Sequence, residues 1–376
     1  MSLAENREDP PMQRRSCVRR SGRRLSTAKP KMSARHLFNF DELRYGGGGD
    51  EKEESEEKDN VDDCDHLPTS SFRSLRVLNE DVVQPGGGMT EHGHCDAEIF
   101  SVVLRGALRH TDSLSKTTER VVAGDVQFTS AGTGVRHSEM NSDDGRGGRR
   151  SAGGGDCLLF QVWILPDTLG LPPSYDHRHF AWLDRLSGGG GGGDDDGDDD
   201  DDDDDEFSRP SLLLSETGEA GSIKIHQRAR VWGYLLEPDN PWQRFDSPFG
   251  PSTSWVVAVS SWTLTEDERS ARAGGGGGSV VVAQASDVVN GGADDGGGNS
   301  HADALERIGP GDTAFVENVA SISIANDGGD ERRYFLLLVM ALGEQRKWAE
   351  LTVEEKWQLF QETQRAKQRE LAYALA

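Results

Sequence analysis

The sequence predicts an all-β protein with two units of similar size, each an antiparallel barrel or sandwich. Short segments rich in β-branched and aromatic residues recur between glycine-containing turns, and no helical segments alternate with them. The pattern runs through residues 72–165 and returns more faintly over residues 212–342. The hydrophobic content is only 34%, because glycine-rich and acidic inserts interrupt both parts.

In the first unit the predicted strands follow one another closely. Residues 74–78 alternate polar and apolar side chains, as a half-buried strand does. Residues 108–112 and 120–122 flank a polar loop, which is typical of a hairpin. Further strands are predicted at residues 98–104, 126–129 and 157–165.

The second unit repeats this pattern, and a helix is predicted after it. Its strands are expected at residues 212–214, 223–226, 231–236, 254–264, 280–283, 313–316, 321–325 and 334–342. Beyond them, Thr352 and Glu355 have the spacing of a capping box, and good helix formers follow. We therefore expect a C-terminal helix that packs on the barrel or on a second subunit.

Composition divides the chain into five segments. We expect a disordered basic tail (residues 1–33), a first barrel (34–185), a disordered Gly/Asp linker (186–208), a second barrel (209–343) and the C-terminal helix (344–376). The tail carries an arginine cluster that also suits a nuclear-import patch or an organelle transit peptide. Acidic residues precede the cluster, and transit peptides avoid acids.

The charge pattern excludes several function classes. About half of the formal net charge of −25 lies in residues 194–206, which cannot bury apolar surface. No basic stripe suggests direct nucleic-acid binding.

The longest apolar run, residues 334–342, is far too short to cross a membrane, and no signal peptide is visible. Four cysteines without a Cys-x-x-Cys pair favour a reducing compartment, so we expect a cytoplasmic or nuclear protein.

Two short motifs carry the chemistry. His92 and His94 stand two residues apart, and so do His137 and Glu139 farther along the chain. Alternate residues of a strand point to the same face, so two such pairs on neighbouring strands can converge on one ion. Imidazole and carboxylate together suit a transition metal. A third pair, His177 and His179, has no second ligand pair downstream, and we expect it to bind no metal.

Several stretches around these motifs resemble the pirin family of cupins. His92, His94 and Glu98 follow Gly86 in the order of the first cupin motif, and residues 130–140 (SAGTGVRHSEM) closely resemble the pirin hallmark. The segments that match the family in the same order are residues 74–83, 160–166 and 222–227. The resemblance covers about residues 70–340, interrupted by the inserts.

The resemblance implies a bicupin: two barrels of the double-stranded β-helix type with a metal only in the first. The implied ligands are His92, His94, His137 and Glu139, and the implied metal is iron, most simply Fe²⁺. Glu98 stands where other cupins have a glutamate ligand, but in pirin-like proteins Glu139 takes that role. Cys95 departs from the family, which tends to have a basic residue there, and we expect it to be packed and inert.

Two functions follow from the resemblance. Some bacterial pirin-like proteins are quercetinases, which implies a dioxygenase that takes a flavonol-like substrate and dioxygen, with Glu139 accepting a substrate proton. We expect Phe100, Val102, Phe128 and Trp163 to supply dry walls or barrel core. The alternative is a non-enzymatic, redox-responsive iron protein that binds transcription factors or other proteins, so the sequence leaves open whether the chain is an enzyme.

Overall fold

The structure is a computed structural model that describes residues 15–19, 25–29, 31–37, 71–141, 155–183, 209–238, 242–265, 268–273, 279–284, 304–327 and 333–343. The predicted linker (186–208) and the predicted C-terminal helix (344–376) lie outside these residues. Among the described residues, no helix is long and apolar enough to span a membrane.

The first unit is built from a large and a small sheet whose neighbouring strands are all antiparallel. The seven-stranded sheet has the order β12-β9-β6-β11-β4-β3-β2, and the four-stranded sheet has the order β5-β10-β7-β8. The strands are β2 (Leu25–Lys29), β3 (Met32–His36), β4 (Leu75–Val83), β5 (Gly88–His94), β6 (Glu98–Arg105), β7 (Ala107–Asp112), β8 (Thr118–Val122), β9 (Asp125–Ser130), β10 (Val135–Met140), β11 (Cys157–Ile164) and β12 (Ser174–His179).

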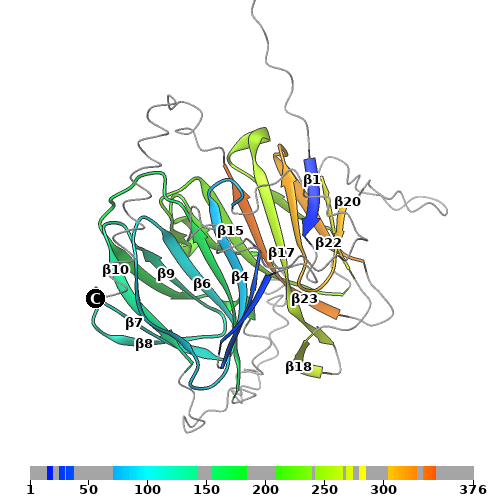
Figure 1. The fold of residues 1–376 in the computed structure, drawn as a ribbon. Coiled ribbons are helices and arrows are strands. Elements are labelled where there is room, and N and C mark those ends of the chain that lie inside the picture. Colours follow the sequence, from blue (N-terminus) through cyan, green and yellow to red (C-terminus); the bar gives the residue numbers. More distant parts are fainter. Residues whose placement is uncertain are drawn as a thin grey trace, which may run out of the picture.

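The second unit has the same plan and lies beside the first (Figure 1). Its eight-stranded sheet runs β1-β21-β17-β23-β15-β13-β14, with β18 paired to β17, and its four-stranded sheet runs β16-β22-β19-β20. Only β13 and β14 pair in parallel among the described strands. The elements are β1 (Arg15–Arg19), β13 (Ser211–Ser215), η4 (Glu219–Gly221), β14 (Ile223–Lys224), β15 (Ala229–Leu236), β16 (Gln243–Asp246), η5 (Gly250–Ser252), β17 (Ser254–Thr265), β18 (Glu268–Ala273), β19 (Val280–Gln284), β20 (Ala304–Ile308), β21 (Thr313–Glu317), β22 (Ser321–Asn326) and β23 (Arg333–Leu342).

This arrangement confirms the predicted all-β bicupin. Each unit packs a large sheet against a small one, as in a jelly roll, so the sheets do not close into continuous barrels. Turns keep most connections between consecutive strands short, and consecutive strands such as β7 and β8 pair as hairpins.

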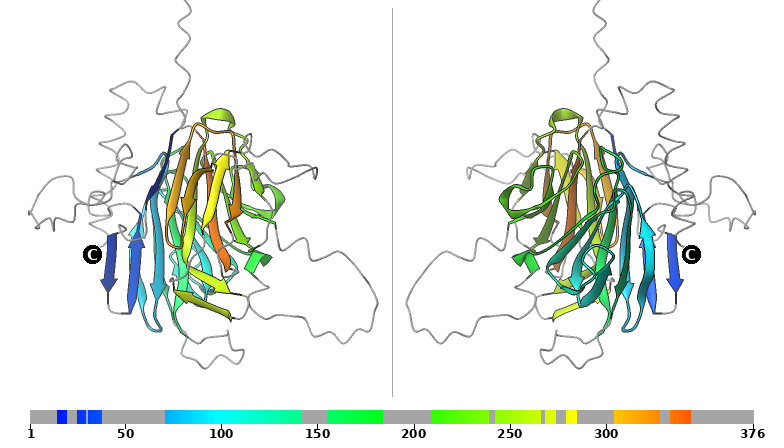
Figure 2. Two further views of the ribbon diagram at one scale, coloured as in Figure 1. Left: turned by 90° about the vertical axis from the view of Figure 1, so that its right-hand side faces the viewer. Right: turned by 90° about the vertical axis from the view of Figure 1, so that its left-hand side faces the viewer.

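The prediction of a disordered tail over residues 1–33 is wrong for three segments. β1 pairs with β21 at the edge of the second unit, while β2 and β3 extend the first unit beyond β4 (Figure 2). The open edges of the large sheets offer unpaired N–H and C=O groups, which an N-terminal segment can satisfy. Cys17 and Val18 bury their side chains there, and Cys17 is disulfide-bonded, which the cysteine count did not predict.

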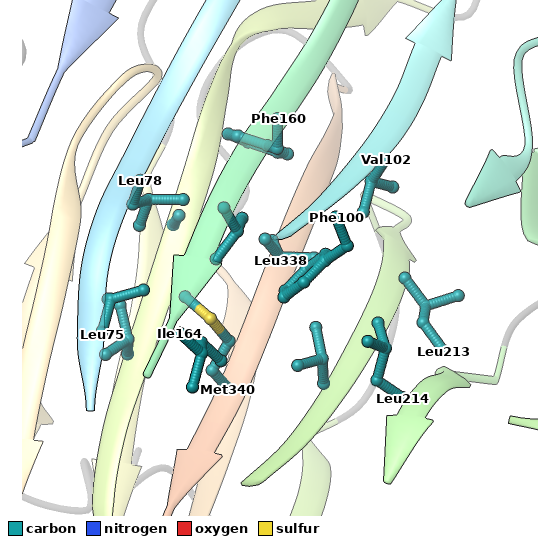
Figure 3. Packing of buried hydrophobic residues seen from close by; sticks show 14 of the residues in the cluster. Leu75, Leu78, Phe100, Val102, Phe160, Ile164, Leu213, Leu214, Leu338 and Met340 are labelled. Atoms are coloured by element: carbon teal, nitrogen blue, oxygen red, sulfur yellow. The ribbon is translucent and has the colours of Figure 1, made fainter. Parts of the chain in front are cut away.

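Strand alternation separates two kinds of interior. On β23, Leu336, Leu338 and Met340 face the first unit, and the intervening side chains fill the second unit. In the first unit, Phe100 and Phe160 face the same central layer (Figure 3). The two large sheets therefore pack against each other through an apolar core, and each unit keeps an interior of its own.

Two buried glutamates also join the units. Glu80 Oε1 accepts hydrogen bonds from Ser260 Oγ at 2.6 Å and from the Ser261 backbone N–H at 2.8 Å. Glu98 Oε2 accepts the His226 backbone N–H at 3.0 Å, and its Oε1 accepts Ser130 Oγ at 2.6 Å. Because both carboxylates are almost fully buried, these bonds hold the second unit in a defined position against the first.

Candidate metal centre

Three imidazoles converge on the inner face of the small sheet of the first unit. β5 and β10 are antiparallel neighbours, with His137 opposite His92. The ligand nitrogens of His92, His94 and His137 lie within 4.8 Å of one another. Their ring centroids are 4.6–4.9 Å apart. The two-residue spacing thus places these side chains on one face, as strand geometry requires.

Glu139 lies two residues beyond His137 on β10. Its carboxylate, His137 and His110 form a second group whose ligand atoms lie within 4.8 Å of one another. His110 stands directly opposite Glu139 on β7. A bulge between His137 and Glu139 shifts the register against β5, and Gly88 allows the close approach there, because a Cβ would lie 2.2 Å from the Glu139 carbonyl oxygen. His137 is therefore common to both groups.

His110 is a site residue that the sequence analysis missed. It is 1% exposed, and its ring stacks on Tyr175 with a centroid distance of 4.6 Å. Its Nε2 lies 3.3 Å from Asp112 Oδ2, and Asp112 is held by the backbone N–H groups of Leu114 and Ser115. The signal was present as a further pair two residues apart, His110 and Asp112, in the predicted hairpin strand.

The electrostatics of the cluster favour a neutral imidazole at His137. Burial, and then the proximity of His94, His92 and His110, lower the pKa of His137 to about 2. Both ring nitrogens of His137 are buried without a hydrogen-bond partner among the described residues. At the rim, His92 Nδ1 lies 2.8 Å from the Thr90 carbonyl oxygen, which orients the ring.

These observations fit a transition-metal ion. Neutral imidazole is the form that binds metals, and buried nitrogens without a partner are otherwise unfavourable. Three imidazoles with a nearby carboxylate suit iron, nickel, zinc or copper better than the hard cations calcium and magnesium. His92, His94 and His137 would hold the ion, with Glu139 beside them.

The wall opposite the imidazoles is polar. Ser101, Gln127 and Gln161 project from the large sheet toward Glu139 and contact its carboxylate. Trp163 also faces the site, since its ring centroid is 4.8 Å from that of His94.

The proposal of dry walls from Phe100, Val102 and Phe128 is wrong. They belong to the central core between the units, on the other face of the large sheet. Each is next in sequence to Ser101 or Gln127, and adjacent strand residues point to opposite faces. Their alternative role as core is the one that the structure supports.

The other histidine pair contacts one carboxylate, that of Asp125. His177 Nε2 lies 2.9 Å from Asp125 Oδ2, and His179 Nδ1 lies 2.7 Å from Asp125 Oδ1. The hydrogen bond to Asp125, the largest cause, raises the pKa of His177 despite partial burial. Burial raises the pKa of Asp125, but the hydrogen bonds from His177, Val122 and His179 outweigh it and leave a lowered pKa.

Comparisons with known proteins agree on one family. Residues 52–164 match the family described as Pirin. A protein of Escherichia coli K12 named quercetin 2,3-dioxygenase is 34% identical over 168 residues, which are 45% of this chain and 58% of that protein. A pirin-like protein of Caulobacter vibrioides is 39% identical over 115 residues, which are 31% of this chain and 45% of that protein. The chain thus spans about half the length of these relatives.

Solved structures show the same fold. The crystal structure of YhhW from Escherichia coli has a TM-score of 0.56 at 22% identity and covers 88% of this chain and 98% of that one. A second structure, described as bacterial pirin YhhW in complex with nickel(II), has a TM-score of 0.55 at 22% identity and covers 88% of this chain and all of that one.

Proposed function

We propose that this chain is a metal-dependent dioxygenase of the quercetinase type, and the match of residues 52–164 to the family described as Pirin supports this proposal. The proposed ligands are His92, His94, His137 and Glu139, and the proposed metal is iron. One observation carries the proposal: three imidazoles, of which that of His137 is buried with a strongly lowered pKa, converge beside a carboxylate in the unit that matches the family described as Pirin.

The proposed substrate is a flavonol-like aromatic compound, with dioxygen as the second reactant. Iron, when bound, supplies Lewis acidity and redox chemistry toward dioxygen. The partly exposed His92 marks the side from which a substrate reaches the buried histidines. Trp163, which is partly exposed beside His94, offers a flat aromatic surface for a planar ring, which supports this substrate class.

Glu139 is the proposed acceptor of the substrate proton. An ionised carboxylate has about four lone-pair directions, and one amide hydrogen bond on each oxygen leaves capacity for other partners. Glu139 is 2% exposed, so bulk water does not compete freely for those positions.

The alternative from the sequence is a redox-responsive iron protein that binds transcription factors. It needs the same ligands, and no described feature favours it over the enzyme. A cytoplasmic or nuclear location, a metal-free second barrel and the role of Cys95 likewise stay predictions.

The test is metal loading followed by turnover. The full chain is loaded with Fe²⁺, metal content is measured, and oxygen uptake is followed with quercetin. We expect stoichiometric metal and quercetin-dependent oxygen uptake, both lost in His137→Ala and retained in the control His179→Ala, whose imidazole pairs with Asp125. Stoichiometric iron without oxygen uptake would overturn the dioxygenase proposal and favour the regulator, whereas absence of metal binding would overturn both.

A further inference from the structure

Glu139 belongs to a closed ring of hydrogen bonds. Gln127 Nε2 donates to Glu139 Oε1 and, at 3.1 Å, to Ser101 Oγ. Ser101 Oγ donates to Gln161 Oε1 at 2.6 Å, and Gln161 Nε2 donates to Glu139 Oε2 at 3.0 Å. All four side chains are at most 3% exposed.

The available donors fix the direction of each hydrogen bond in this ring. A serine hydroxyl has one hydrogen, and Ser101 Oγ lies 3.1 Å from Glu139 Oε1 but only 2.6 Å from Gln161 Oε1, so its hydrogen goes to the glutamine. That bond fixes which end of the Gln161 amide faces Glu139. Gln127 uses its two amide hydrogens, one for the carboxylate and one for the serine. Each Glu139 oxygen therefore accepts one amide N–H.

The fold builds the ring from a row of directly opposed residues. Ser101 lies on β6 between Gln127 on β9 and Gln161 on β11, and it pairs with both in the strand register. Glu139 comes from β10 in the facing sheet. The ring therefore spans the interior of the first unit at the depth of the histidines. The interior of the second unit is filled with apolar side chains instead.

We propose that Ser101, Gln127 and Gln161 are positioning residues that hold the Glu139 carboxylate in one orientation toward the metal ion. This deepens the proposed function and rests on it. Neutral donors on both oxygens stabilise the carboxylate and prevent its rotation, but none brings a charge that would compete with the ion. Partners of this kind typically change metal affinity by about 10–100-fold when they are removed.

The test removes Ser101, the ring member that links the two glutamines. Co²⁺ affinity and the visible Co²⁺ spectrum are measured for wild type and Ser101→Ala in the full chain. Ser260→Ala is the matched control, because Ser260 is another buried serine that donates at 2.6 Å to a buried carboxylate, that of Glu80. We expect about 10–100-fold weaker Co²⁺ binding and an altered spectrum for Ser101→Ala only.

Thermal unfolding separates positioning from loss of structure, since both serine variants lose a buried hydrogen bond. If Ser101→Ala does not fold, Gln161→Glu carries the same test, because it keeps the acceptor for Ser101 and replaces the donor to Glu139 with a like charge. A folded variant with wild-type Co²⁺ affinity and spectrum overturns the inference alone. A wild-type chain that binds no Co²⁺ overturns the metal site itself.

Discussion

Replacing His137 by leucine tests whether the site is strained without its metal. Both His137 nitrogens are buried without a hydrogen-bond partner among the described residues. Leaving a buried polar group unpaired costs about 1–3 kcal/mol. A leucine removes both nitrogens at similar volume, and a change of shape costs up to about 1.5 kcal/mol. Because two nitrogens are relieved and the change of shape offsets part of the gain, we expect metal-free His137→Leu to be more stable than metal-free wild type by roughly 0.5–6 kcal/mol at pH 7.5.

The pH dependence of the unfolding free energy gives this prediction a second, independent test. The folded pKa of His137 is about 2, against 6.5 for a free histidine. Below pH 6.5 the unfolded chain therefore takes up a proton that the folded chain refuses, so stability is complete above pH 6.5 and falls as pH decreases toward 2. The loss is about 1.4 kcal/mol per pH unit for one proton. His137→Leu lacks this contribution, so its advantage should grow with acidity.

The assay is urea unfolding of both proteins in chelator at pH 7.5, 6.5 and 5.5. The difference in unfolding free energy should widen by about 1.0 kcal/mol between pH 6.5 and 5.5, because the unfolded histidine is already half protonated at pH 6.5. Saturating Ni²⁺ should shift the difference toward wild type, since a ligand at 100 times its Kd adds about 2.7 kcal/mol to the protein that keeps the full ligand set. Equal stabilities with parallel pH dependence would show that His137 is solvated or hydrogen-bonded in solution, and the burial argument would fail.

Two further predictions concern the scaffold. Glu80→Ala leaves the donors of Ser260 and Ser261 unpaired and should lower the free energy of unfolding in urea by about 2–6 kcal/mol. The control Glu91→Ala removes an exposed pair with Arg136 and should lower it by under about 1 kcal/mol. Equal losses would refute the role of Glu80. His177→Ala should destabilise most between about pH 4 and 6.5. Because the pKa of His177 is raised, its contribution to folding stability is complete below pH 6.5 and is lost as pH rises through that pKa. The lowered pKa of Asp125 makes its contribution complete above pH 3.8. A melting-temperature difference that persists unchanged at pH 10 would contradict the pairing.

Local patterns predicted the strands of both units well because alternation reports burial directly. They failed at the N-terminus, where β1 and β2 lie in an arginine-rich segment whose composition is typical of a disordered tail. β1 forms because β21, far along the chain, leaves an edge that it can pair with. They also placed Phe100 and Phe128 at the metal site, although these side chains lie in the core between the units. Alternation shows that the two faces of a strand differ, but it does not show which face lines the site.

The sequence by itself determined the all-β class and the identity of four candidate ligands, because a strand repeats every two residues and both motifs use that spacing. Only the tertiary structure decided that His110 joins them and that Ser101, Gln127 and Gln161 surround Glu139. Those residues meet through the register of neighbouring strands and the packing of two sheets, and such long-range pairing leaves no pattern within any one segment.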